Sequence, residues 1–343
     1  MAKKQKYWQS RAERLELQSE RTALKYRQEL EREYARAQRN IDKDITYWYN
    51  RLASNNGMTL AEARKLLSRD ELQEFKWTLK EYIWYGQDNA LSGQWLKELE
   101  NASAKKHISR LESIKLQMRQ HIEALYSSEH AGTTELMGNL YRDRYYHQAY
   151  ELQKGVGIGW DLQKVDTAKI DKILSKSWTS DGFTISDKIW KHRDQTLQTL
   201  QTELIHALMR GEAPQSLIKT ISDKMGVSKR NAGRLVMTES AWVSSEATKD
   251  SYKDLGVERY EILATLDTRT SDICQDMDGR VFDMTDYQSG VTAPPFHPYC
   301  RSTTVPYFDD MDDFERVARD KAGNAYYVPS NMKYKDWYQK YVK

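Results

Sequence analysis

Apolar residues recur at steps of three and four along the N-terminal part of the chain. The positions are Tyr26, Leu30, Tyr34, Ala37, Ile41, Ile45, Trp48 and Leu52. This spacing averages close to the natural repeat of an α-helix, so it predicts a nearly straight helix from about Tyr7 to Leu52 and not a tightly supercoiled one. Residues 1–213 contain no proline and therefore no obligatory helix breaker.

Turn and capping residues divide the following sequence into further helices. The cluster Ser54–Gly57 predicts a turn, and Thr59 followed by Glu62 has the spacing of a capping box, so a second helix is expected from there towards Tyr85. Helices are also expected over 102–126 and 133–152. Their aromatic side chains are expected to anchor helix packing: Trp77, Tyr82, Trp84, Tyr85, Tyr141, Tyr145 and Tyr146.

Glycine residues are expected to mark the ends of segments in the second half. The repeated glycines between Gly155 and Gly159 predict a flexible joint, because a dinucleotide-binding loop would need a preceding strand and another spacing. A helix is expected after Gly182, another from Pro214, and a third capped by Ser228. The glycines expected to end these helices are, in order, Gly211, Gly226 and Gly256.

Short β-propensity runs follow the last helix. Strands are expected over 257–266, 280–282 and 303–308. The predicted fold is mainly α with a C-terminal α+β module: long N-terminal helices, then a helical segment leading into a small β-containing module rich in Cys, His and Pro. The predicted parts are an elongated helical region over 1–155, a helical segment over 160–256, the β-containing module over 257–308, continuous with 182–256, and a C-terminal tail over 309–343.

Composition limits the class of protein. Charged residues make up 30% of the chain, hydrophobic residues 39%, and the mean hydropathy is −0.84, as expected for elongated helices with much solvated surface. No apolar run approaches the roughly 20 residues of a membrane span, and no signal peptide is evident, so we expect a soluble protein made in the cytoplasm. The net charge of +3 does not indicate a nucleic-acid binder, although residues 1–40 hold eleven Lys or Arg against six Glu. Two alternatives remain open for this segment: a solvated rod that packs on a neighbouring helix, and contact with DNA or an acidic protein surface.

The scarce chemically distinctive residues gather between Asp267 and Pro306. Both cysteines, Cys274 and Cys300, lie there with His297, and thiolate and imidazole ligands favour zinc. A fourth ligand is not evident; the candidates are Asp267, Asp276 and Asp278. A structural metal, a catalytic zinc and a metal-free turn with packed thiols all remain open. A disulfide is not expected in a reducing compartment.

The same stretch is predicted to form a rigid clasp. Pro294, Pro295 and Pro298 restrict the backbone around His297, and Asp278-Gly279 predicts a tight turn. Arg234, Thr238 and Glu239 on the preceding helix are expected to serve structure, as an Arg–Glu pair or as polar groups that face the module. No hydrolase elbow, Walker loop, His-Glu-x-x-His helix or deaminase motif is found, so neither catalytic nor cofactor-binding residues are assigned.

At these residues the sequence resembles the phage minor head proteins typified by the Mu F protein and the SPP1 head morphogenesis protein. The similarity covers about residues 182–307. Its motifs are Arg234-x-x-x-Thr238-Glu239, Asp267-x-Arg269-Thr270-x-x-x-Cys274, Asp278-Gly279 and Pro294-Pro295-x-His297-Pro298-x-Cys300-Arg301. Many members end the last motif Cys-Arg-Cys, whereas here Ser302 stands in place of the second cysteine.

The resemblance implies a non-enzymatic protein of the phage head. It implies association with the portal protein inside the procapsid, contact with scaffolding or major capsid protein and with phage DNA, and a place in the virion after assembly in the host cytoplasm. Some relatives carry a toxin or ADP-ribosyltransferase domain after the module; this chain ends at Lys343, so no such extension is expected. Two alternatives remain: a zinc-dependent enzyme with Glu239 as general base near Cys274, His297 and Cys300, and a DNA-binding assembly factor.

Overall fold

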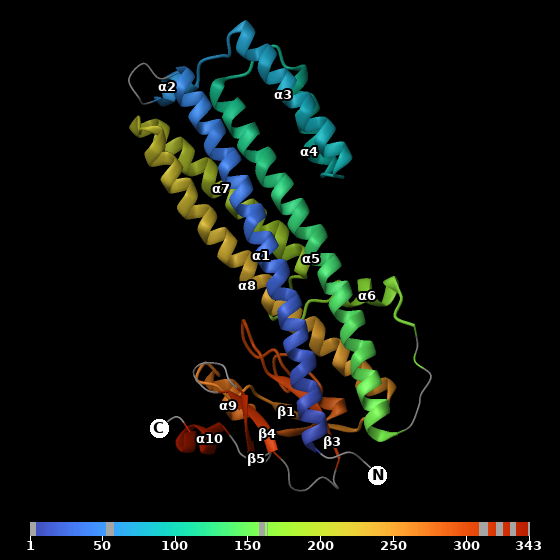
Figure 1. The fold of residues 1–343 in the computed structure, drawn as a ribbon. Coiled ribbons are helices and arrows are strands. Elements are labelled where there is room, and N and C mark those ends of the chain that lie inside the picture. Colours follow the sequence, from blue (N-terminus) through green and yellow to red (C-terminus); the bar gives the residue numbers. More distant parts are fainter. Residues whose placement is uncertain are drawn as a thin grey trace. The chain divides into compact units, whose positions relative to one another are not determined.

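The computed structural model describes residues 5–52, 58–157, 162, 164–308, 315–319, 325–329 and 334–341, and they are mostly helical (Figure 1). The helices are α1 (Gln5–Leu52), α2 (Leu60–Ala63), α3 (Arg69–Asp88), α4 (Gly93–Ala104), α5 (Arg110–Val156), α6 (Thr167–Leu174), α7 (Ile185–Arg210), α8 (Pro214–Asp254), α9 (Asp272–Met277) and α10 (Tyr334–Tyr341). The strands are β1 (Arg259–Leu263), β2 (Val281–Asp283), β3 (Thr303–Tyr307), β4 (Glu315–Arg319) and β5 (Ala325–Pro329). The predicted fold class is confirmed. None of these helices is both long and apolar enough to cross a membrane.

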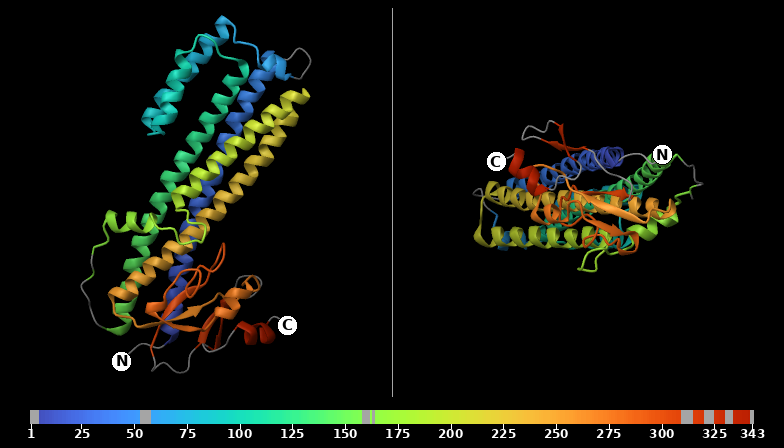
Figure 2. Two further views of the ribbon diagram at one scale, coloured as in Figure 1. Left: turned by 180° about the vertical axis from the view of Figure 1, so that it is seen from behind. Right: turned by 90° about the horizontal axis from the view of Figure 1, so that it is seen from below.

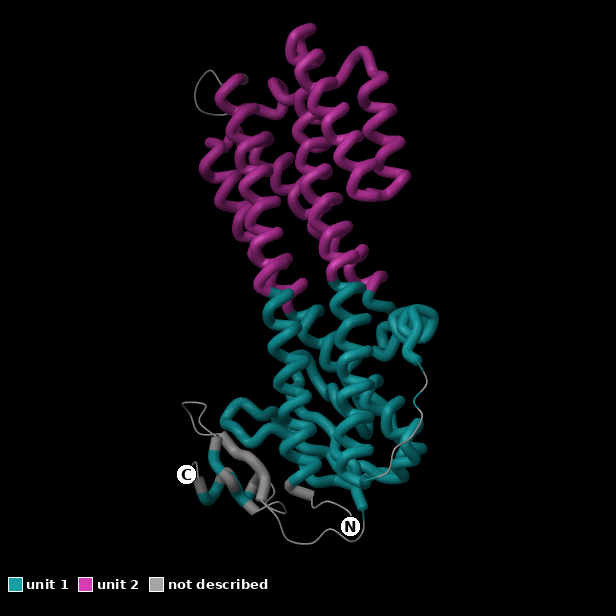
Figure 3. Tube along the Cα trace, turned by 45° about the vertical axis from the view of Figure 1, so that its right-hand side comes forward, with its two compact units in different colours: residues 1–27, 133–185, 234–343 teal, residues 28–132, 186–233 magenta. Residues whose placement is uncertain are grey.

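The chain forms two compact units, and each draws on separate parts of the sequence (Figure 3). Unit 1 contains residues 1–27, 133–185 and 234–343, and unit 2 contains residues 28–132 and 186–233. Both units therefore take residues from before and after position 155. The predicted division along the sequence at that position stays a prediction.

Unit 2 is built from α1, α5, α7 and α8 with a helical hairpin of α3 and α4. The predicted stripe of α1 is confirmed, since Leu30, Tyr34, Ile41, Ile45 and Trp48 are all buried. A buried polar network joins the helices: Tyr34 donates to Glu129 at 2.8 Å, and the Tyr126 and Thr196 hydroxyls lie 2.7 Å apart. Phe75 and Leu79 of α3 pack against Trp95 and Leu99 of α4 in a separate small core.

Several predicted helix boundaries in this unit are wrong. The Thr59–Glu62 capping box is present, but its helix ends at Ala63, and Ser68 caps α3 with a second box. α5 is continuous where two helices were predicted. α8 likewise runs through Gly226, so Ser228 lies inside the helix and does not cap it. The Ser228 hydroxyl instead lies 2.9 Å from that of Thr196. Tertiary packing thus overrides a local glycine, which costs a helix only about 1 kcal/mol.

Unit 1 holds the β-containing module, whose strands are drawn in orange to red in Figure 2. Its antiparallel sheet has the strand order β2-β1-β3, with Tyr260 opposite Phe282 on one side and Pro306 on the other. The three strands predicted before residue 309 are confirmed. The first turns of α1 belong to this core, because Trp8 and Ala12 are buried in one cluster with Tyr260, Ile262 and Val305.

Elements beyond the predicted module complete unit 1. β4 and β5 pair as an antiparallel hairpin that the sequence did not reveal. Trp337 of α10 is buried with Leu266 and Val328, and its indole donates to Tyr326 at 2.6 Å. Part of the predicted C-terminal tail is thus a packed helix, α10. Gly155 is no joint either: it lies inside α5 against Trp8, whereas Gly159 is outside the described residues.

Candidate metal centre

Cys274, His297 and Cys300 come together in unit 1 as a compact group of donors. Ser271 caps α9 by accepting from the amide of Cys274, which fixes that residue in the first turn. The Cys274 Sγ lies 3.2 Å from the His297 Nε2 and 3.7 Å from the Cys300 Sγ. All ligand atoms of the group lie within 4.8 Å of one another. The structure therefore brings together the donors that the sequence singled out.

The backbone after Pro295 positions the other two donors. Tyr299 has a φ of 61°, in the left-handed region, and the resulting turn lets the Cys300 amide donate to the His297 carbonyl at 3.1 Å. The His297 Nδ1 lies 2.8 Å from the Pro298 carbonyl, to which it can only donate. That contact leaves the Nε2 lone pair facing the thiols, which is the arrangement of a ligating histidine with its second nitrogen fixed by a carbonyl.

The two thiols differ in acidity. A hydrogen bond from Cys274, backbone amides and the Ser302 hydroxyl lower the pKa of Cys300 to about 7, although burial opposes this. The pKa of Cys274 is raised, first by its hydrogen bond to Cys300 and then by burial. The hydrogen bond between the two sulfurs thus stabilises the thiolate form of Cys300 and the thiol form of Cys274. Metal binding deprotonates such ligands further, because the thiolate and not the thiol is the ligand.

The geometry of the group fits a tetrahedral ion. Two sulfur ligands, each about 2.3 Å from a zinc ion, lie about 3.8 Å apart in a tetrahedron, close to the observed separation. Ser302 is buried, and its hydroxyl is among the groups that lower the pKa of both thiols. The residues present therefore fit a metal with three strong protein ligands.

The aspartates proposed as a fourth ligand are used elsewhere. Both Asp267 oxygens bind Arg301, at 2.5 and 2.9 Å, and one also accepts from the Arg269 amide at 2.9 Å and the Thr270 hydroxyl at 3.2 Å. Burial alone would raise the Asp267 pKa, but Arg301 and the Arg269 amide outweigh it and lower the pKa. Among the described residues, the three-donor group includes none of the aspartates.

Asp278 and Gly279 form the predicted tight turn. The Asp278 carboxylate accepts from the Ala264 amide at 2.9 Å, which ties the end of α9 to the strand β1. Gly279 has a φ of 71°, a conformation that favours glycine. These contacts and the Asp267–Arg301 pair give the clasp a physical basis.

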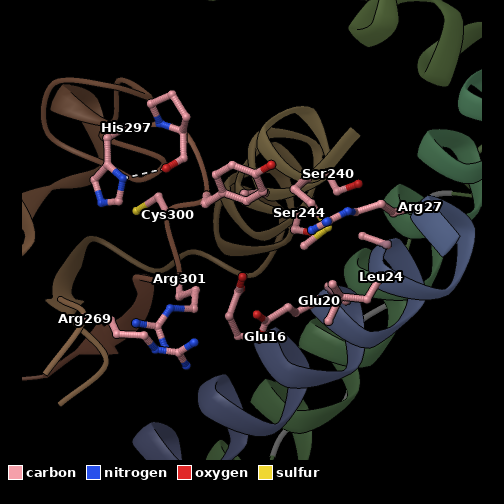
Figure 4. A pocket seen from close by; sticks show the side chains of 16 residues that line it. Glu16, Glu20, Leu24, Arg27, Ser240, Ser244, Arg269, His297, Cys300 and Arg301 are labelled. Atoms are coloured by element: carbon pink, nitrogen blue, oxygen red, sulfur yellow. Dashed lines mark hydrogen bonds between the residues drawn. The ribbon is translucent and has the colours of Figure 1, made fainter. Parts of the chain in front are cut away.

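A cavity of about 490 Å³ adjoins the donor group (Figure 4). His297 and Cys300 line it from the module, α1 contributes Glu16 and Glu20, and α8 contributes Ser244. Burial raises the pKa of Glu16 to about 7, although Arg144 lowers it. The Ser244 hydroxyl is buried and has no hydrogen-bond partner among the described residues. Local sequence patterns do not indicate this wall, because α1 and the module are far apart in the chain.

Arg234, Thr238 and Glu239 of α8 do not face this cavity together. The residues of α8 that line it are Met237, Ser240, Ala241 and Ser244. With 3.6 residues per turn, Glu239 lies about 150° around the helix from the centre of that stripe. Its carboxylate accepts from the Trp178 indole at 2.7 Å, and Trp178 stacks on Trp242. Thr238 donates to the Arg234 carbonyl at 2.8 Å.

Comparison with known proteins places this site within a known family model. Residues 198–305 match the model described as Phage Mu protein F like protein. An NAD(+)–arginine ADP-ribosyltransferase, EFV, of Enterococcus faecalis is 23% identical over 210 residues, which are 57% of this chain and 42% of that protein. An uncharacterized protein of Haemophilus influenzae is 23% identical over 120 residues, or 35% of this chain and 27% of its own. The chain thus spans less than half of either relative. No solved structure matches.

Proposed function

Residues 198–305 are a phage Mu F-like domain, and from this premise we propose that the protein is a minor head protein of a phage. In this proposal it associates with the portal protein during procapsid assembly, with contacts to scaffolding or major capsid protein, and it stays in the virion. A contribution to DNA packaging or ejection belongs to the same proposal. The observation that carries it is the family match.

The match begins in the second half of α7, in unit 2, and continues into the β-containing module of unit 1. It includes α8, the strands β1 and β2 and the donor group, and it ends within β3. The clasp of Asp267 with Arg301 also lies inside it. The matched region is therefore an organised module with its own polar contacts, as expected of a domain that recurs in different proteins.

We propose further that the Cys274, His297 and Cys300 group holds a structural zinc ion. When bound, the ion would cross-link α9 to the loop before β3, two segments that are separated by more than twenty residues of sequence. The position of Glu239 supports a structural role for the ion and not a catalytic one. The Glu239 carboxylate accepts a hydrogen bond from the Trp178 indole, and Glu239 does not line the cavity beside the donor group. The protein in this proposal acts without catalysis.

Co-expression with the portal protein of the same phage tests the head-protein assignment. The full chain is needed, because the first turns of α1 lie in the core of unit 1. Tagged portal protein is expected to retain the full chain through affinity and size-exclusion steps. Purified procapsids should contain the chain, and procapsids formed in its absence should package less DNA. Failure to co-purify with portal protein and absence from procapsids would overturn the assignment.

The name of the Enterococcus relative suggests a separate enzymatic test. Incubation of this chain with labelled NAD⁺ and arginine-rich acceptor protein is expected to give neither nicotinamide release nor labelled acceptor. Release above the level of a heat-denatured control would overturn the non-enzymatic assignment while leaving the head-protein assignment intact.

Direct DNA binding by the basic N-terminal segment is the weaker candidate. Arg11 lies 3.4 Å from the Glu151 carboxylate, and Arg14 is ion-paired with the same group. These pairs use part of the local positive charge inside unit 1. A salt-dependent affinity for duplex DNA that disappears with Arg21→Gln/Lys25→Gln would favour this alternative.

A further inference from the structure

Two tryptophans of α3 are exposed although helix packing would readily bury them. Trp77 and Trp84 are 66% and 67% exposed. With 3.6 residues per turn, they lie about 20° apart around the helix and about 10 Å apart along it. Phe75 and Leu79, which enter the core of the α3–α4 hairpin, lie about 160° away from Trp77. The expectation that both tryptophans anchor helix packing is therefore wrong.

Three carboxylates lie on the same side of α3 as these tryptophans, spread from its first residues to its last. Asp70, Glu81 and Asp88 are exposed and lie within about 60° of the tryptophans around the axis. No ion pair between described residues involves any of the three. We call the five residues Asp70, Trp77, Glu81, Trp84 and Asp88 the outer face of α3. It combines a large apolar area with three carboxylates over about 27 Å; Lys80 is also exposed on this side, so the net charge of the face is −2.

A groove continues this face towards α1. Its volume is about 810 Å³, and Trp77 and Asp70 line it together with Tyr47 and Arg51 of α1. Within it the Arg51 guanidinium lies 2.6 Å from the Glu74 carboxylate and 5.4 Å from the centre of the Tyr47 ring. The chain thus already holds one arginine between an aromatic ring and a carboxylate on this surface, which is a favourable cation–π arrangement.

We propose that the outer face of α3 binds a basic amphipathic helix of a partner protein. The apolar stripe of that helix covers Trp77 and Trp84, whose spacing equals two turns of a helix, and its flanking Lys and Arg residues pair with Asp70, Glu81 and Asp88. The carboxylates repel phosphates and anionic lipid, so they favour a basic protein segment over nucleic acid or a membrane surface. Exposed aromatic residues in such a patch are the usual centres of binding energy.

Binding of a synthetic peptide to the full chain tests this site. The probe is a fluorescein-labelled 18-residue helix of about five turns, with leucine along one stripe and lysine and arginine on both flanks. Its twin carries glutamate in place of every basic residue. Fluorescence anisotropy is expected to show salt-sensitive binding of the basic peptide, with the acidic twin at least about tenfold weaker.

Variants of the chain then locate the site. Trp77→Ala/Trp84→Ala and Asp70→Asn/Glu81→Gln/Asp88→Asn should each weaken the basic peptide at least about tenfold, as expected for central residues of an interface. The matched control, Tyr150→Ala/Asp194→Asn/Asp283→Asn, removes one aromatic ring and two carboxylates that are exposed elsewhere, and it should bind as the parent does. Circular dichroism and the melting temperature confirm that each variant is folded.

Four results would overturn the proposal: no binding of the basic peptide, equal binding of its twin, parent-like binding by both face variants, or weakening by the control. Light scattering, which measures self-association, tests whether a second copy of the chain occupies this face. Self-association of the parent that Trp77→Ala/Trp84→Ala abolishes would make a second copy the occupant and would also contradict the proposal.

Discussion

Asp267 shows how one side chain can hold a loop module together. Its carboxylate binds Arg301 through both oxygens in a largely buried setting. Asp267→Asn leaves the arginine without its counter-charge, so we expect a loss of about 3 kcal/mol in the free energy of unfolding. Urea denaturation at pH 7 measures it, with the exposed Asp283→Asn as control, for which little change is expected.

The same pair has a defined pH dependence. Because the folded-state pKa of Asp267 is lowered, its contribution is present above the unfolded value and is lost as pH falls through the folded value. The stability difference between the parent and Asp267→Asn should therefore shrink below about pH 4. A difference that persists undiminished at pH 2 would show that the charge of Asp267 is not its source.

Zinc binding can be tested at Ser302. The parent is expected to contain about one zinc ion per chain by elemental analysis, and Cys274→Ser or Cys300→Ser should lose it. Ser302→Cys supplies a third thiolate two residues after Cys300, so its zinc affinity in competition with a chelator should rise at least about tenfold. A parent that neither contains zinc nor takes it up would contradict the metal assignment.

At the scale of elements, α1 and α5 approach each other closely at Gly155. A Cβ added there would lie 2.0 Å from a ring carbon of Trp8. Gly155→Ala must displace this buried tryptophan and should destabilise the protein by about 1 to 3 kcal/mol in thermal or urea unfolding. Gly93→Ala is the control, because nothing lies within 4 Å of its Cβ and a helix gains up to about 1 kcal/mol from alanine.

Arg144 of α5 connects three further elements of unit 1. Its guanidinium lies 3.3 Å from Glu16 of α1, and it donates to Thr248 of α8 at 3.0 Å and Thr303 of β3 at 2.9 Å. Arg144→Met removes two buried hydrogen bonds and the counter-charge of Glu16, which then takes up a proton, so a loss of about 2 to 3 kcal/mol is expected in urea unfolding at pH 7. The exposed Arg142→Met should change stability by less than about 0.5 kcal/mol.

Elements whose signals are local could be predicted, and those set by distant contacts could not. The stripe of α1, the Thr59–Glu62 box and the three strands around the donor group follow from spacing and turn residues. Gly226 was wrong as a helix end, because a long packed helix tolerates one glycine. The donors were found from residue type, whereas the cavity wall from Glu16 to Arg27 depends on packing between segments far apart in the chain.

For the whole molecule, a buried acid in the interior of unit 2 gives a pH signature. Burial raises the pKa of Glu129 to about 7, although the hydrogen bond from Tyr34 lowers it. The folded state therefore holds a proton that the unfolded state releases, so stability should fall as pH rises from about 4.5 to 7 and level off above that. Each unit of pH costs about 1.4 kcal/mol over this range.

Glu129→Gln tests that signature because it keeps the shape and removes the titration. Its urea midpoint should fall less steeply than that of the parent between pH 4.5 and 7, and the remaining slope includes the contribution of Glu16. Glu81→Gln, on the exposed side of α3, should follow the parent curve. Equal slopes for Glu129→Gln and the parent would show that Glu129 titrates at an ordinary pKa in the folded protein.

The core of unit 1 has a consequence for how the protein is made on the ribosome. The ring of Trp8, near the start of the chain, lies 5.9 Å from that of Phe308. Unit 2 ends at Gly233, so all its residues are translated before the sheet of unit 1. The first turns of α1 cannot complete their core packing until β3 has been translated. Until then their apolar side chains lack the partners that bury them in the folded protein. Translation that halts before β3 would leave this segment as an exposed site for chaperones and proteases.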